Sequence, residues 1–308
     1  MNKGLSQGMS STMLFLTAII WGTGFIASQI ALDLHYTPMQ VIGGRMGIAA
    51  ICLNIFFYKR LISMKKEEII AGSVLGVMML SAFIFQMFGL KYSTPSVNAF
   101  VTASYVVLIP FLKYLKDRTK LDIFSNISAV MTVTGIGLIS LTSGFDISFG
   151  AFLTFICAVF YALQFIFTEK YTRKYDPINL TIAMINFSGI VSLGICLISA
   201  ILFHNVPKTT LKGTMSFLYM GILCTFICFL FQNIGQKYTS AVKAAILLSL
   251  ESVFCAIFSA LIFKEEFTGR MLTGCIIIFA AIIISETKLS FIFDRKKENA
   301  PKAAEGEA

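Results

Sequence analysis

Apolar stretches of about 20 residues recur along the chain and are separated by short polar segments. A helix rises about 1.5 Å per residue, so a stretch of this length can cross the roughly 30 Å hydrocarbon layer of a bilayer. The pattern predicts ten spanning helices. Their expected ranges are 13–32, 39–58, 69–90, 96–114, 124–141, 149–167, 178–203, 214–235, 241–263 and 271–285. The sequence therefore predicts an all-α integral membrane protein.

Composition supports a membrane location. The 308 residues are 56% hydrophobic and 13% charged, whereas soluble domains are about one quarter charged, which excludes a single water-soluble core. The net charge of +9 would suggest nucleic-acid binding in a soluble protein. Here, with the N-terminus inside, nineteen of the 25 Lys and Arg residues fall in inner segments and five in outer ones. The positive-inside rule then predicts a multi-pass plasma-membrane protein with both termini in the cytoplasm and no nucleic-acid partner.

A sequence repeat divides the chain into two halves. The segment FQMFGLKYST at 85–94 returns as FQNIGQKYTS at 231–240, at a constant offset of 146. Tyr-Thr-Pro at 36–38 and Tyr-Asp-Pro at 175–177 match at an offset of 139. Each repeating unit holds five spans, and an odd number places the second copy upside down in the membrane. We expect two inverted five-helix repeats at 12–142 and 149–286, followed by a disordered cytoplasmic tail at 287–308.

Two glycine pairs have the spacing of close helix contacts in membranes. Gly43 and Gly47 lie in the second expected span, and Gly72 and Gly76 in the third. Small residues four apart allow two backbones to approach. The same spacing also arises from the ordinary composition of apolar helices, so the sequence leaves both interpretations open.

Three polar or amphipathic residues stand out because such groups are costly inside a bilayer unless paired. Glu251 lies ten residues past Ala241, about 15 Å along the ninth span and near the midplane. It could bind a substrate amine or a proton, or form an interhelical hydrogen bond as a neutral acid. Arg45 lies about 9 Å inside the second span and could snorkel outward or receive an anionic group. Trp21, half-way along the first span, could face a pocket or pack in the core.

Other polar residues inside the spans are weaker candidates. Tyr105 is the most informative, because the offset of 146 pairs it with Glu251. Gln86 and Gln232 are paired in the same way, and we expect them to be structural. The complete set of candidate substrate-binding residues is Trp21, Arg45, Asn98, Tyr105, Tyr161, Gln164 and Glu251, with Glu251 also the candidate for proton coupling.

The sequence offers little for catalysis or metal binding. Only His35 and His204 are present, and HExxH, nucleophile-elbow and Walker motifs are absent. The seven cysteines form no C-x2-C pair, and Cys224 and Cys228 lack further ligands at a usual metal spacing. We expect no enzyme activity, no cofactor and no metal. Active transport would then draw on a solute or ion gradient.

Several short motifs together resemble the EamA family of the drug/metabolite transporter superfamily. They are WGTGF at 21–25, Arg45 after a proline-led second span, GLKYST at 89–94 with its partner GQKYTS, LES at 250–252 and KEEF at 264–267. The resemblance covers residues from about 12 to 286. Two positions depart from the family pattern: Ser252 stands where the family commonly has proline, and Lys264 where it has glycine.

The resemblance implies a secondary carrier of small metabolites that works by alternating access at a midplane site. Some members of the family move amino acids, usually outward. A cavity offering Arg45, Glu251, Trp21 and Tyr105 would suit a zwitterion with an apolar part. The alternatives are a non-transporting membrane sensor or assembly protein with a transporter fold, and an integral membrane enzyme. The expected partners are a small solute, the lipid bilayer and a proton or other coupling ion; substrate, direction and oligomeric state stay open.

Overall fold

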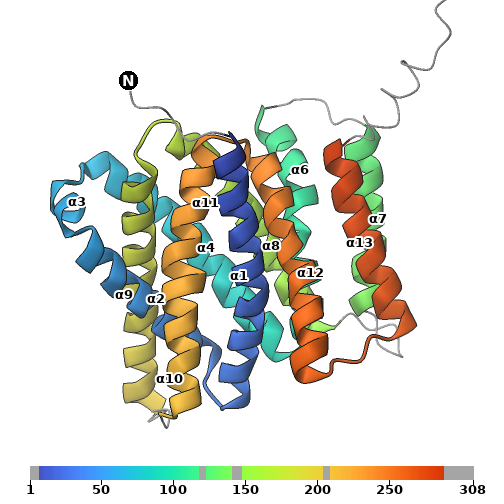
Figure 1. Ribbon diagram of the computed structural model, residues 1–308, viewed down its shortest axis with the longest axis horizontal. Helices are drawn as coiled ribbons and strands as arrows, with labels where there is room; N and C mark the ends of the chain where they lie inside the picture. Colours follow the sequence, from blue (N-terminus) through green and yellow to red (C-terminus); the bar gives the residue numbers. More distant parts are fainter. Residues whose placement is uncertain (1–6, 118–122, 141–147, 204–208, 288–308) are drawn as a thin grey trace, which may run out of the picture.

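The computed structural model describes residues 7–117, 123–140, 148–203 and 209–287, and every regular element in these ranges is a helix (Figure 1). The helices are α1 (Gln7–Asp33), α2 (Pro38–Phe56), α3 (Tyr58–Ser63), α4 (Lys66–Lys91), α5 (Pro95–Ala103), α6 (Tyr105–Asp117), α7 (Ile123–Ser140), α8 (Phe149–Thr172), α9 (Pro177–Phe203), α10 (Leu211–Leu218), the π-helix η1 (Tyr219–Ile227), α11 (Cys228–Lys237), α12 (Ala241–Phe263) and α13 (Gly269–Thr287).

The predicted fold class is confirmed. Within the described ranges, eight helical stretches are long and apolar enough to cross a membrane, with α5 and α6 forming one stretch and α10, η1 and α11 another. Two shorter apolar segments, Asn126–Leu138 and Gly269–Ile284, lie in α7 and α13. These ten segments follow the ten predicted spans in order.

Most helices extend beyond the apolar stretch that predicted them. The first helix begins at Gln7 rather than 13, because its polar start is held by the Ser10 hydroxyl, which donates to the Gly235 carbonyl at 2.8 Å. The fourth span is broken at Ser104, which separates α5 from α6. Farther along, Pro110 has no N–H to donate to the Val106 carbonyl, which loosens α6. The ninth span matches α12 at both ends.

The repeated motif has the same structural role in both halves. Thr94 and Ser240 are the N-caps of α5 and α12, and each side-chain oxygen accepts a backbone N–H three residues later. A Cβ on Gly89 would lie 2.3 Å from Thr154 Oγ1 in α8, and one on Gly235 would lie 2.9 Å from Leu14 Cγ in α1. The motif therefore combines a helix contact with the start of the next helix.

The helix contacts between the two halves come in matched sets. α1 packs against α11 and α12, and its counterpart α8 packs against α4, α5 and α6. α2 packs against α9, and α7 against α13 at one side of the bundle (Figure 1). Exchanging the two halves converts the contacts of α1 into those of α8 and leaves the α2–α9 and α7–α13 pairs unchanged, as expected for two five-helix repeats.

Both glycine pairs are helix contacts, which confirms the packing interpretation. A Cβ on Gly43 would lie 2.7 Å from Cys196 Sγ, and one on Gly72 would lie 2.4 Å from the Ala183 Cβ. Gly76 likewise meets the Met184 carbonyl oxygen at 2.9 Å. All three neighbours belong to α9, so the small residues let α2 and α4 approach the same helix.

Some predicted features lie outside the described residues. The expected tail at 287–308 is one of them, except for Thr287, the last residue of α13. His204 and several of the basic residues counted above also fall there: Lys3, Arg118, Lys120, Lys208, Lys288, Arg295, Lys296, Lys297 and Lys302.

Candidate functional site

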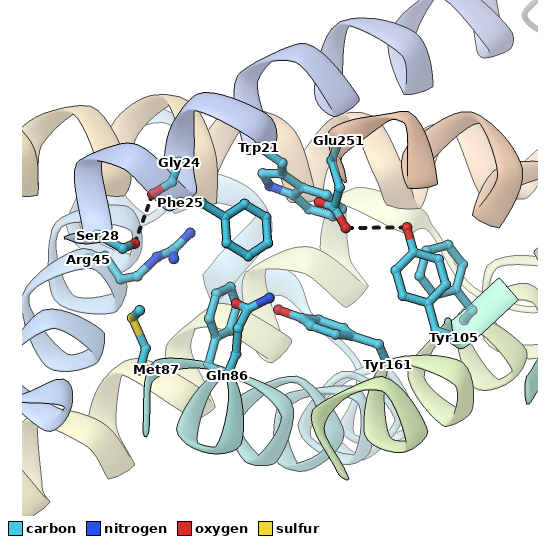
Figure 2. A pocket seen from close by; sticks show the side chains of 12 residues that line it. Trp21, Gly24, Phe25, Ser28, Arg45, Gln86, Met87, Tyr105, Tyr161 and Glu251 are labelled. Carbon is cyan, nitrogen blue, oxygen red and sulfur yellow. Dashed lines mark hydrogen bonds between the residues drawn. The ribbon is translucent and has the colours of Figure 1, made fainter. Parts of the chain in front are cut away.

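A cavity lies inside the bundle, among side chains from α1, α2, α4, α6, α8 and α12 (Figure 2). It is lined by Trp21, Gly24, Phe25, Ser28, Arg45, Phe83, Gln86, Met87, Tyr105, Tyr161, Phe165 and Glu251. Its volume, counted over positions open to the centres of water molecules, is about 30 Å³. One water needs roughly 10–15 Å³ by this measure, so the cavity is contracted and a metabolite would enter only after the helices move apart.

Arg45 faces this cavity and does not snorkel. It is buried, with 4% of its surface exposed. Its Nε donates to Thr225 Oγ1 at 3.0 Å, and its Cζ lies 4.2 Å from the ring centre of Phe83. None of the described carboxylates lies within 4.0 Å of the guanidinium. A buried charge without a protein counter-ion is costly, which favours an anionic ligand group at this position.

Glu251 lies near the middle of α12 and is also buried. Its Oε1 accepts a long hydrogen bond of 3.4 Å from the Tyr105 hydroxyl. The two residues that the offset of 146 placed at equivalent points of the repeats thus meet across the centre of the molecule. In Figure 2 the Phe25 ring lies between Arg45 and Glu251. The site therefore offers a cationic and an acidic group separated by aromatic surface.

Trp21 lines the cavity with its ring, while its indole nitrogen is already bonded. Nε1 donates to the Cys224 carbonyl at 2.7 Å, so this N–H is not free for a substrate. The ring lies 5.2 Å from that of Phe229. Phe83 and Tyr161 form the corresponding pair at 5.9 Å, again with one ring from each repeat. Trp21, Phe83 and Tyr161 line the cavity, so rings from both repeats contribute to its apolar walls.

Two predicted site residues lie outside the cavity and tie helices together instead. The Asn98 amide donates to the Gln86 carbonyl at 3.2 Å and to Thr154 Oγ1 at 2.7 Å. Gln164 donates to Thr168 Oγ1 at 3.1 Å, and its carbonyl oxygen accepts from the Gln232 amide at 3.2 Å. These bonds pair the buried amide N–H groups of both residues with acceptors inside the bundle. Gln86, which we expected to be structural, lines the cavity.

Sequence reasoning missed the phenylalanines of the site. Phe25 and Phe165 line the cavity from α1 and α8, and Phe83 lines it from α4. A signal for the first two was present: WGTGF at 21–25 aligns with YALQF at 161–165 at an offset of 140, which pairs Trp21 with Tyr161 and Phe25 with Phe165. Metal ligation finds no support in the described ranges, where no group of three or more His, Cys, Asp or Glu could hold an ion.

A second polar cluster, centred on Glu169, links helix ends at the face where α1 begins. Glu169 accepts from Lys113 Nζ at 2.8 Å, from Arg173 Nη2 at 2.7 Å and from the Ala241 backbone N–H at 3.2 Å. The donors belong to α6, to the C-cap of α8 and to the first turn of α12. One carboxylate therefore links α6, α8 and α12 at this face.

Comparison with known proteins identifies the class. The sequence model of the EamA-like transporter family matches residues 9–141 and 148–287, one match in each half, and the chain belongs to this family. An uncharacterized transporter of Archaeoglobus fulgidus is 30% identical over 285 residues, covering 92% of this chain and 87% of that protein. A second from the same organism is 26% identical over 286 residues, covering 90% and 96%.

The fold has a counterpart among solved structures. A protein crystal structure aligns with a TM-score of 0.68 and 16% identity, covering 96% of this chain and all of that one. At this identity the likeness concerns the fold alone. Family membership makes the protein a multi-pass membrane transporter of this family.

Proposed function

We propose that this transporter is a secondary carrier that exports amino acids or related zwitterions by alternating access, with its binding site in the cavity between Arg45 and Glu251. The observation that supports this most strongly is the separation of the two charged groups. Among the described residues, Arg45 has no carboxylate neighbour, and the Glu251 carboxyl accepts one long hydrogen bond, from the Tyr105 hydroxyl. A zwitterion supplies one group of each sign.

The aromatic lining supports a substrate with an apolar part. Trp21, Phe25, Tyr161 and Phe165 line the space around the two charged groups. Rings of this kind exclude water and strengthen electrostatic contacts with a bound ligand. An amino acid fits this combination of two charges and an apolar side chain.

The small cavity volume supports a mechanism in which the helices move. A site with room for about two waters cannot hold an amino acid in this conformation. Opening toward one face would widen it, and the inverted repeats supply two related conformations in which the roles of the halves are exchanged. The units proposed for this exchange are the repeats at 12–142 and 149–286.

The distribution of charge supports an orientation for the proposed carrier. The Glu169 cluster, Lys237 and Lys243 lie at the face where α1 begins, and the positive-inside rule places this face in the cytoplasm. Export then begins with binding from this face. In this scheme Glu251 binds either the substrate amine or a proton. Binding of a proton from outside would then favour release of the amine, which couples substrate export to proton entry.

Counterflow in proteoliposomes tests the proposal. Purified protein is reconstituted with one unlabelled amino acid inside, and uptake of labelled amino acids and small amines is followed without an ion gradient. We expect saturable exchange of at least one zwitterion, and Glu251→Gln should lose the pH dependence of exchange. Glu266→Gln, at an exposed position, is the matched control. Absence of exchange across a broad panel, from folded protein, would contradict the carrier and favour a sensor or assembly role.

A further inference from the structure

The π-helix η1 places two consecutive residues, Cys224 and Thr225, against two side chains that line the cavity, Trp21 and Arg45. The Cys228 N–H donates to the carbonyls of Leu223 and Thr225 rather than to that of Cys224, which an α-helix would use. The Cys224 carbonyl, which the Cys228 N–H does not use, accepts a hydrogen bond from the Trp21 indole N–H at 2.7 Å. The wider turn therefore creates a free backbone acceptor, and Trp21 occupies it.

The next residue, Thr225, likewise provides a hydrogen-bond acceptor, in this case for Arg45. The Thr225 hydroxyl donates to the Met220 carbonyl, five residues earlier, at 2.8 Å. In an α-helix a threonine hydroxyl bonds to a carbonyl three or four residues earlier, so this bond is a consequence of the π geometry. A hydroxyl has one proton, and here it is committed to Met220. The lone pairs of Oγ1 therefore accept the Arg45 Nε–H at 3.0 Å.

This bond determines which edge of the guanidinium is available. A carboxylate can pair with an arginine side-on, through Nε and one Nη, or end-on, through both Nη atoms. With Nε bonded to Thr225, the side-on edge is occupied. Phe83, 4.2 Å from Cζ, restricts the group further. The two Nη atoms are what Arg45 can present to a ligand.

We propose that Thr225 is a positioning residue that makes Arg45 a selective, end-on receptor for a planar oxyanion, the carboxylate of the substrate. This inference rests on the proposed function and deepens the account of the same site. Thr225 does not line the cavity and acts through Arg45. Its contribution should therefore concern substrates that carry a carboxylate and not those that lack one.

Transport kinetics provide the first test. Thr225→Val removes the acceptor while keeping the side-chain volume, and Thr225→Ser keeps the hydroxyl. For the zwitterion that the wild type carries, we expect the valine variant to raise KM about 5- to 30-fold with little change in kcat, the effect of losing one hydrogen bond to a buried charged group. Serine should restore the wild-type KM. The amide of the same amino acid, which lacks the carboxylate, should show no difference among the three proteins.

Thr172→Val is the matched control for changing a buried threonine. Its hydroxyl is bonded to carbonyls of its own helix, those of Thr168 and Glu169. This variant should leave KM unchanged. An equal rise in KM for the zwitterion and its amide in Thr225→Val, or failure of serine to restore KM, would overturn the positioning role.

A second measurement does not depend on transport. The chain has six arginines, so NMR of protein labelled with ¹⁵N at arginine Nε gives few signals, and Arg45→Lys assigns the one from Arg45. We expect the Arg45 Nε–H to exchange slowly with solvent in wild type and Thr225→Ser and at least about tenfold faster in Thr225→Val. Equal exchange in all three would overturn the inference. If the wild type shows no counterflow, the proposed function fails, while this spectrum still decides the role of Thr225.

Discussion

Neutralising Glu169 should loosen the face of the bundle where α1 begins. Its carboxylate receives hydrogen bonds from Lys113, Arg173 and the Ala241 backbone, and so links α6, α8 and α12. Glu169→Gln keeps the shape of the side chain but removes the charge. The amide can accept a hydrogen bond through its oxygen, while its NH2 group faces a cation in place of an acceptor.

The contacts differ in strength because they differ in exposure. The Arg173 side chain is 70% exposed, so its i,i+4 pair with Glu169 contributes at most about 0.5 kcal/mol. The Lys113 and Glu169 side chains are 29% and 13% exposed, and their charged hydrogen bond contributes about 1 to 2 kcal/mol. A negative charge at the start of α12 adds about 0.3 to 1 kcal/mol. Together these contacts stabilise the closed arrangement of this face by about 2 to 3 kcal/mol. Losing them in Glu169→Gln should therefore shift the equilibrium between closed and open arrangements roughly 30- to 150-fold toward the open one.

Cysteine labelling measures this shift. Phe165→Cys places a thiol on the cavity wall, and a membrane-impermeant maleimide is added to vesicles that expose the face where α1 begins. The labelling rate, corrected for the seven native cysteines, should rise by at least about tenfold when Glu169→Gln is added. Glu67→Gln, at an exposed position in the first turn of α4, should leave it unchanged. An unchanged rate in folded Glu169→Gln protein would refute the reasoning.

Three further changes test packing and the cavity. Gly72→Ala should lower stability in detergent by about 1 to 3 kcal/mol, because its Cβ would lie 2.4 Å from another Cβ, whereas Gly194→Ala, with open space, should raise it by up to about 1 kcal/mol. Asn54→Leu should cost about 1 to 3 kcal/mol by leaving the Asn186 amide without its reciprocal partner. Binding of the transported solute should change the fluorescence of Trp21, the chain's single tryptophan.

Each of these expectations has a contradicting result. Thermal unfolding that shows equal effects of the two alanine substitutions would contradict the close contact between α4 and α9. Wild-type stability in Asn54→Leu would mean that the Asn186 pair contributes nothing measurable. An unchanged emission spectrum at saturating solute would place the substrate away from Trp21.

The repeat in the sequence predicted one contact in the cavity that polarity alone did not. The offset of 146 paired Tyr105 with Glu251, and the two residues are in contact. Polarity alone also selected Asn98 and Gln164, which bond to neighbouring helices. A polar residue in a span can face a cavity or another helix, and the choice depends on the rotation of each helix, which apolar stretches do not specify.

The orientation of Arg45 and the π-helix are two further features that the sequence pattern could not predict. Depth in the second span allowed Arg45 either to snorkel or to face the bundle, and the outcome depends on Thr225, which is 180 residues away in the chain. The π geometry of η1 lies within an apolar stretch that predicts a regular helix. Its acceptors follow from the backbone hydrogen bonds, which the pattern of side chains does not reveal.

The most direct test of the central claim compares three solutes in three proteins. The solutes are the transported amino acid, its amide without the carboxylate and its analogue without the amine; the proteins are wild type, Arg45→Gln and Glu251→Gln. Counterflow competition gives the affinity of each combination. We predict that removing the carboxylate weakens binding to the wild type by about tenfold or more, equivalent to 1.4 kcal/mol, and has little effect on binding to Arg45→Gln. Likewise, removing the amine should weaken binding to the wild type and have little effect on binding to Glu251→Gln. Equal losses in wild type and variants would contradict a zwitterion site between these two residues.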